Sequence, residues 1–120
     1  MLPDSRVYSF LDNARGFTVH FLEGQKIISD LILMHHFKRD GFSFFRDTVL
    51  TSLQIINFLK PGENIGYYID SPKPFFGYKI ELNHQGNFRT LLLPKDFDQS
   101  PKTITGQLRL TKIIADSKSP

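Results

Sequence analysis

The chain has 120 residues, of which 40% are hydrophobic and 22% are charged. This length allows one domain with a modest core and leaves no room for two. No apolar run reaches the roughly 18 residues that a membrane-spanning helix needs, and residues 1–6 lack the basic-then-apolar order of a secretory signal. We therefore expect a cytoplasmic protein with no membrane partner. Because the sequence contains no cysteine, it can form neither a disulfide nor a thiolate zinc site.

The charge balance is mildly basic, with 15 Lys and Arg against 12 Asp and Glu and a net charge of +3. The basic residues never cluster beyond a pair, so a mixed, solvated surface is the expectation. Aromatic usage is the more unusual feature, with 12 Phe and 4 Tyr. This composition predicts a core rich in large flat side chains.

The first half of the chain predicts one strand followed by two helices. Residues 16–23 alternate in the way that is typical of a strand. Helical spacing of apolar residues then predicts a helix from about residue 24 that breaks at residues 38–41. A longer helix is expected over residues 43–60, ended by Pro61. Its apolar stripe comprises Phe45, Val49, Leu50, Leu53, Ile56 and Leu59.

The second half predicts an antiparallel meander, because alternating segments are separated by turn and loop residues. Residues 84–87 supply turn chemistry, and residues 94–101 form a polar, proline-bounded loop. The alternating segments are residues 65–69, 76–82, 88–93 and 104–115. The expected fold class is therefore α+β, a mainly antiparallel sheet packed with two helices.

Enzyme signatures are absent from the sequence, which holds no dinucleotide-binding or phosphate-binding glycine loop, no nucleophile elbow and no zinc-protease motif. His35 and His36 are adjacent, and two successive helical residues point about 100° apart and cannot chelate one metal together. The carboxylates are scattered singly, so no acid and base pair is indicated. We expect no enzymatic activity, and no catalytic, cofactor-binding or metal-binding residue.

Several short motifs occur in one order along almost the whole chain. Residues 6–10 and the Ala-Arg-Gly of residues 14–16 lead into the first strand. Residues 58–60 end the second helix, and Pro74 and Arg89 follow at matching distances. In these motifs the chain resembles the N-terminal domain of the redox-regulated bacterial holdase chaperones, the heat shock protein 33 family. The match departs from the family pattern around Pro74, where the preceding glycines are missing.

The resemblance implies a domain assignment and a function. Residues 1–120 should form a single, incomplete N-terminal chaperone-like domain, since the family's domain continues with further strands. The family binds zinc in a C-terminal domain through cysteines, which this chain lacks, so neither zinc nor a redox switch is expected here. The implied function is that of an ATP-independent holdase, which binds unfolding client proteins through exposed apolar surface.

We expect the client-binding surface on the sheet face opposite the helices. The face that packs on the helices is predicted to carry Phe76, Tyr78, Ile80, Leu82, Leu108 and Leu110. The candidate client-binding residues on the opposite face are Tyr68, Phe75, Leu91 and Leu93. Alternatively, the missing part of the domain or a second copy of the chain covers this face. A homodimer or an oligomer with exchanged elements is therefore also expected.

The rival function is a small basic nucleic-acid-binding domain, in which aromatic and basic residues alternate on strands. Those residues are Tyr67, Tyr68, Phe88, Lys73, Lys79 and Arg89. No RNP-like string supports this function, and we do not expect nucleic acid as a partner. An enzyme of an unrecognised class is the remaining alternative. Arg89 itself is expected to be an exposed cross-strand charge.

Overall fold

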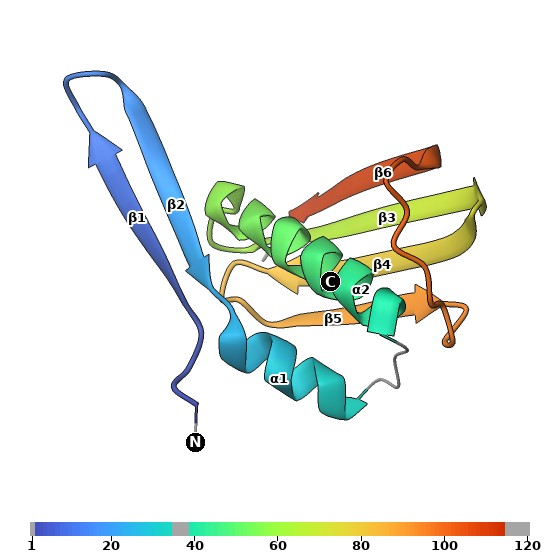
Figure 1. Ribbon diagram of the computed structural model, residues 1–120. Helices are drawn as coiled ribbons and strands as arrows, with labels where there is room; N and C mark the ends of the chain where they lie inside the picture. Colours follow the sequence, from blue (N-terminus) through green and yellow to red (C-terminus); the bar gives the residue numbers. More distant parts are fainter. Residues whose placement is uncertain (1, 35–38, 115–120) are drawn as a thin grey trace, which may run out of the picture. The chain divides into compact units, whose positions relative to one another are not determined.

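The computed structural model describes residues 2–34 and 39–114. These residues confirm the α+β class, with two α-helices, a short 3-10 helix and two antiparallel sheets (Figure 1). They fall into two compact units, one ending at Met34 and the other beginning at Arg39. That residues 1–120 act as a single domain stays a prediction.

The first unit begins with a two-stranded hairpin. Strand β1 (Arg6–Asp12) pairs antiparallel with β2 (Phe17–Glu23). Gly16 closes the turn between them with a φ of 73°, a backbone conformation that favours glycine. The alternation of residues 16–23 predicts β2 correctly. It does not predict β1, whose apolar residues are partly adjacent to one another and show no clean period of two.

Helix α1 (Gln25–Met34) follows β2 directly, and its start agrees with the predicted start near residue 24. The backbone N–H of Ile27 donates a hydrogen bond to the Oγ of Ser5 at 3.2 Å, which ties the helix to the segment before β1. The adjacent histidines His35 and His36, which were not expected to bind a metal together, lie outside the described residues.

The second unit begins with helix α2 (Arg39–Leu53). The sequence predicted a break in the helices at residues 38–41, but residues 39–41 are helical, so this prediction is wrong for these residues. Gly41 lies in the first helical turn. A Cβ at this position would lie 1.9 Å from the backbone oxygen of Phe97, so the glycine allows a close contact rather than ending a helix. Asp40 also favours a helix start here, because its negative charge lies near the positive end of the helix dipole.

The predicted long helix over residues 43–60 is divided. The α-helix ends at Leu53 and continues as the 3-10 helix η1 (Gln54–Phe58). The side-chain amide of Asn57 donates to the backbone oxygen of Gln54 at 3.0 Å, and such a side-chain bond competes with the α-helical ladder. The apolar stripe is correct for the buried residues Phe45, Val49 and Leu53.

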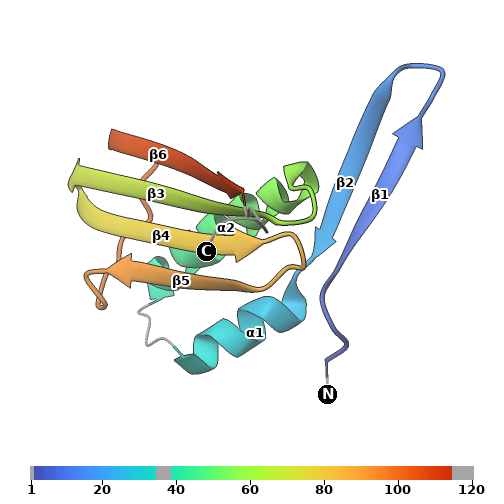
Figure 2. The ribbon, with the colours of Figure 1, turned by 180° about the vertical axis from the view of Figure 1, so that it is seen from behind.

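The second unit also contains a four-stranded antiparallel sheet with the strand order β5-β4-β3-β6. Its strands are β3 (Glu63–Lys73), β4 (Phe75–Asn83), β5 (Phe88–Leu93) and β6 (Thr105–Ile114). Helix α2 lies across one face of this sheet, which we call the inner face; the strands lie in front of α2 when seen from behind (Figure 2). We call the opposite face the outer face.

Aromatic rings form the core between α2 and the inner face, as the composition predicts. Phe45 meets Tyr78 with ring centroids 6.2 Å apart, and Phe44 meets Phe76 at 5.1 Å. Phe97, from the connection between β5 and β6, joins them at 5.3 Å from both Phe44 and Phe76. The expected polar loop therefore contributes a buried aromatic anchor.

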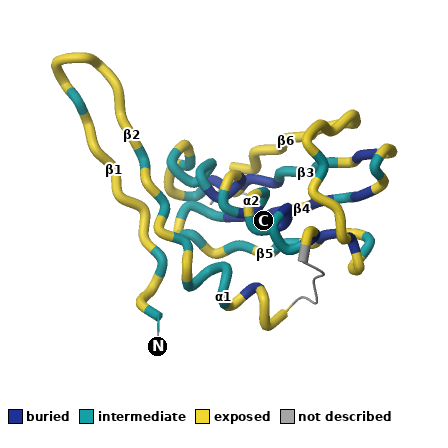
Figure 3. The backbone as a smooth tube through the Cα atoms, in the orientation of Figure 1, coloured by how far each residue is buried: buried dark blue, intermediate teal, exposed yellow. Residues whose placement is uncertain are grey.

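The prediction for the packed face is right for β4 and wrong for β6. The four predicted residues of β4, from Phe76 to Leu82, are buried. Leu108 and Leu110 align with the inner face, yet they are 61% and 55% exposed. β6 is an edge strand, and all ten of its residues are exposed (Figure 3).

An ion pair fastens β6 to the start of β3. The Nζ of Lys112 lies 2.5 Å from the Oε2 of Glu63, whose side chain is almost fully buried. The other carboxylate oxygen accepts a hydrogen bond from the backbone N–H of Lys60 at 2.6 Å. The hydrogen bond from Lys112, followed by that from Lys60, holds the pKa of Glu63 below its ordinary value.

Candidate functional site

A row of four side chains crosses the outer face of the sheet from one edge strand to the other. From β5 to β6, the strand register aligns Leu91, Lys79, Tyr68 and Arg109. Each strand contributes one residue, and neighbouring strands lie about 4.8 Å apart. The row therefore places an aromatic ring between two cations, with a leucine beside the first cation.

Tyr68 contacts both cations of this row. The Nζ of Lys79 lies 5.5 Å from the ring centroid, and the Cζ of Arg109 lies 4.9 Å from it, both within the range of a cation–π interaction. The ring leans along β3 over Gly66, where a Cβ would lie 2.6 Å from the Tyr68 hydroxyl. Glycine at this position is what lets the tyrosine lie flat on the sheet.

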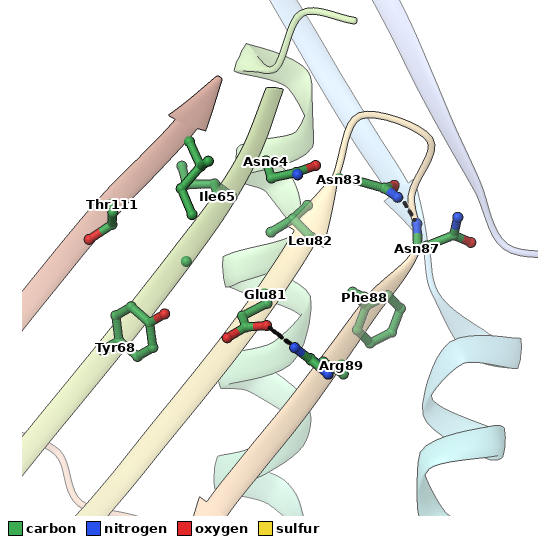
Figure 4. Close-up of a pocket in the computed structure, with 12 residues that line it drawn as sticks. Asn64, Ile65, Tyr68, Glu81, Leu82, Asn83, Asn87, Phe88, Arg89 and Thr111 are labelled. Atoms are coloured by element: carbon green, nitrogen blue, oxygen red, sulfur yellow. Dashed lines mark hydrogen bonds and ion pairs between the residues drawn. The ribbon is translucent and has the colours of Figure 1, made fainter. Parts of the chain in front are cut away.

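An open pocket of mixed polar and apolar lining, about 450 Å³ in volume, lies beside Tyr68 on the outer face (Figure 4). The Nε of Arg89 donates a hydrogen bond at 2.8 Å to one carboxylate oxygen of Glu81, and the Nη2 lies 2.7 Å from the same oxygen. The Arg89 side chain is 84% exposed, which confirms the prediction of an exposed cross-strand charge. Glu81 and Arg89 neutralise each other, so the pocket offers hydrogen bonds and little net charge.

An open apolar corner of about 530 Å³ lies at the other end of the outer face. Its most prominent side chains are Phe75, which is 72% exposed, and Leu93, which is 44% exposed. Ser71 also lines it, and the Oγ of this serine is buried without a hydrogen-bond partner in the described part of the chain. A β-bulge shapes the corner: Gly106 approaches Asp70 so closely that a Cβ would lie 2.1 Å from the Asp70 backbone oxygen.

The structure places the four predicted client-binding residues on one face but not in one patch. Tyr68 belongs to the cation row, and Leu91 lies next to Lys79 in that row. Phe75 and Leu93 form the apolar corner. Alternation along β4 could have placed Lys79 on this face. Arg109 could not be placed from the sequence, because the pairing of β6 with β3 is not encoded in any local pattern.

The aromatic residues of the rival nucleic-acid function are separated by the same register. Tyr67 aligns with Ile80 and Phe88 aligns with Leu82, so both belong to inner-face rows. Burial raises the pKa of Tyr67 above its ordinary value. Tyr68 aligns with Lys79 on the outer face, and Phe88 lines the outer-face pocket beside Arg89.

The hairpin of the first unit carries a second apolar surface, which we call the hairpin face. Tyr8 pairs with Phe21, and Phe10 pairs with Val19, so these four side chains project from one side. All four are exposed, and the Phe10 and Phe21 rings meet edge to face at 5.8 Å. The alternation of residues 17–21 indicates the two side chains that β2 contributes to this face. The two that β1 contributes follow only from the pairing of the strands.

Metal-ligating side chains do not gather in the described residues: no three His, Asp or Glu side chains there are placed to hold a metal ion. None of the described helices is both long and apolar enough to cross a membrane. No protein-family model, curated protein or solved structure matches this chain. The resemblance to the redox-regulated holdases accordingly stays a prediction.

Proposed function

We propose that this chain is an ATP-independent holdase domain, which binds unfolding proteins through exposed apolar surface. The observation that carries the proposal is the hairpin face, where Tyr8, Phe10, Val19 and Phe21 stand exposed side by side. Contiguous exposed apolar side chains mark interaction surfaces, whereas scattered ones are ordinary. A two-stranded hairpin is also marginally stable alone in water, so a partner that covers this face stabilises it.

The apolar corner gives the second unit a surface of the same kind. Phe75 and Leu93 line an open hollow, and an open hollow suits a flexible apolar segment better than a rigid small molecule. The hydrophobic effect is non-directional, so such surfaces can bind many unfolded sequences without a defined motif. This is the property that a holdase requires.

Self-association of the chain follows from the same surfaces. A second copy can cover the hairpin face or pair with the free edge of β6, whose side chains are all exposed. We propose a homodimer, formed by pairing or by exchange of elements, as the resting state that client proteins displace. Sedimentation at micromolar concentration should show the dimer, and a chain that sediments only as a monomer contradicts this part of the proposal.

Light scattering of a thermally unfolding client protein tests the holdase function directly. We expect the chain to suppress aggregation in several-fold molar excess without ATP. Phe10→Ser with Phe21→Ser should weaken suppression through the hairpin face, and Phe75→Ser with Leu93→Ser should weaken it through the apolar corner. Phe58→Ser is the matched control, since Phe58 is 75% exposed but belongs to neither surface. An absence of suppression by the parent chain rejects the holdase function.

A further inference from the structure

We propose that the outer face selects client segments in which an acidic residue accompanies an apolar one. This inference rests on the proposed holdase function and names the class of segment that the outer face prefers. It is carried by two cations beside an apolar corner on a single open surface, and by the absence of an ionic partner for either cation among the described residues.

The charges on the outer face do not cancel. Lys79 and Arg109 contact the Tyr68 ring, and no described carboxylate lies within ion-pair distance of either. Glu81 is neutralised by Arg89. Asp70 is the remaining carboxylate of the described outer face, so Lys79 and Arg109 leave that face with an excess of one positive charge. An acidic side chain from a partner therefore finds an attractive field here, and a basic one does not.

The two cations are held in place before a partner arrives. Each packs on the ring of Tyr68, and Gly66 in turn allows that ring to lie against the sheet. Long basic side chains on an open surface normally lose much rotamer freedom when they form an ion pair. Because the Tyr68 ring already restricts Lys79 and Arg109, less of that entropy is lost when a partner's carboxylate binds.

The cation row lies one step from the apolar corner. Leu93 is opposite Gly77, two positions before Lys79 on β4, which corresponds to about 7 Å along the strand. Gly77 has no side chain, and the group beside this path is the Asp70 carboxylate, whose Oδ1 lies 3.6 Å from where a Cβ of Gly77 would be. An extended segment places side chains of alternate residues on one side at the same spacing of about 7 Å. The face therefore fits an acidic residue two positions from an apolar residue.

Fluorescence anisotropy with three labelled peptides tests this selectivity on the full chain. The peptides share an extended apolar core and carry glutamate, glutamine or lysine two positions from each apolar residue. At low ionic strength we expect the glutamate peptide to bind roughly tenfold more tightly than the glutamine peptide, since individual exposed charge pairs are weak and two act together. The advantage should shrink as salt is added, because exposed charges are screened.

Charge-removing variants locate the effect. Lys79→Gln with Arg109→Gln should abolish the preference for glutamate and leave binding of the glutamine peptide unchanged. Lys95→Gln with Lys102→Gln is the matched control, because both lysines lie in the connection between β5 and β6, away from the cation row. The double variant Lys79→Arg with Arg109→Lys keeps both positive charges and should retain the preference for glutamate. If it does, loss of the preference in the glutamine variant is due to the missing charges and not to altered folding.

The outcomes separate the two proposals. If the glutamate and glutamine peptides bind equally, or if removing both cations has no effect, the selectivity is disproved while the holdase function stands. If none of the three peptides binds and no client is protected, the holdase function fails and the selectivity fails with it. Tighter binding of the lysine peptide also overturns the inference.

Discussion

The hydroxyl of Tyr78 on β4 lies 2.9 Å from the Oγ of Ser52 on α2, in the buried layer between helix and sheet. The Ser52 hydroxyl also bonds the backbone oxygen of Thr48 in the preceding helical turn. A polar bond at the centre of an aromatic core fixes the position of α2 along the sheet more strictly than ring contacts alone. Together with the ring contacts of Phe44 and Phe45, this bond holds α2 on the inner face.

Stability should fall at alkaline pH because of Tyr78. Burial raises the pKa of its phenol far above the ordinary value, and the hydrogen bond with Ser52 opposes this only in part. The folded state therefore retains a proton that the unfolded state releases above about pH 10. Stability should be complete below that pH and decline as the pH rises. Urea unfolding at several pH values should show a shallower decline for Tyr78→Phe, and an unchanged one for the exposed control Tyr8→Phe.

Stability should also fall in acid because of the ion pair between Glu63 and Lys112. The pKa of Glu63 is lowered by its hydrogen bonds, so its contribution is present above the ordinary carboxyl pKa of about 4.3 and is lost as the pH falls through the lowered value. Lys112→Met should destabilise the chain near neutral pH and reduce this acid loss. Lys79→Met removes a lysine that has no ion-pair partner among the described residues, and it should leave the acid profile of unfolding unaltered.

Leu53→Ala should cost about 2 to 5 kcal/mol of unfolding free energy, through the loss of buried surface and the cavity left behind. Leu53 is buried at the end of α2, where the sequence predicted a core residue. Phe58→Ala is the control, since this exposed residue on η1 should change stability little. A chemical denaturation curve for Leu53→Ala that coincides with that of the parent contradicts the assigned stripe.

Gly41→Ala should destabilise the chain, although alanine is ordinarily favoured over glycine in a helix by about 1 kcal/mol. The added Cβ would lie 1.9 Å from the backbone oxygen of Phe97, and the backbone there cannot yield as a flexible side chain can. Gly77→Ala provides the comparison, because its nearest neighbour is a side-chain oxygen at 3.6 Å. Thermal melts should show a lowered midpoint for the first variant and little change for the second.

Client protection by this chain should not respond to a thiol-specific oxidant such as diamide, or to reductant. The chain contains no cysteine, so no thiolate can be oxidised and no zinc can be released from one. The measurement is light scattering of an unfolding client with chain that has been pretreated with oxidant or reductant. A change in protection that exceeds the effect of the reagent on the client alone contradicts the prediction.

Local patterns in the sequence determined most of the sheet and much of the core. Alternation along residues 76–82 was enough to place Tyr78 inside and Lys79 outside, because successive strand residues point to opposite faces. The helical stripe likewise identified Phe45 and Leu53. For the same reason the four candidate residues on β3, β4 and β5 were assigned to the correct face.

Only the tertiary structure decided which strands are neighbours and which apolar rows are covered. The pairing of β6 with β3 brings Arg109 to Tyr68 across about forty residues of chain, and no local periodicity contains that information. The same pairing extends the inner-face row of the buried Tyr78 to Leu108, which is nevertheless exposed. Gly41 misled the prediction because its role is a contact with Phe97, far along the chain. Periodicity reports which way a side chain points, whereas burial depends on what packs against it.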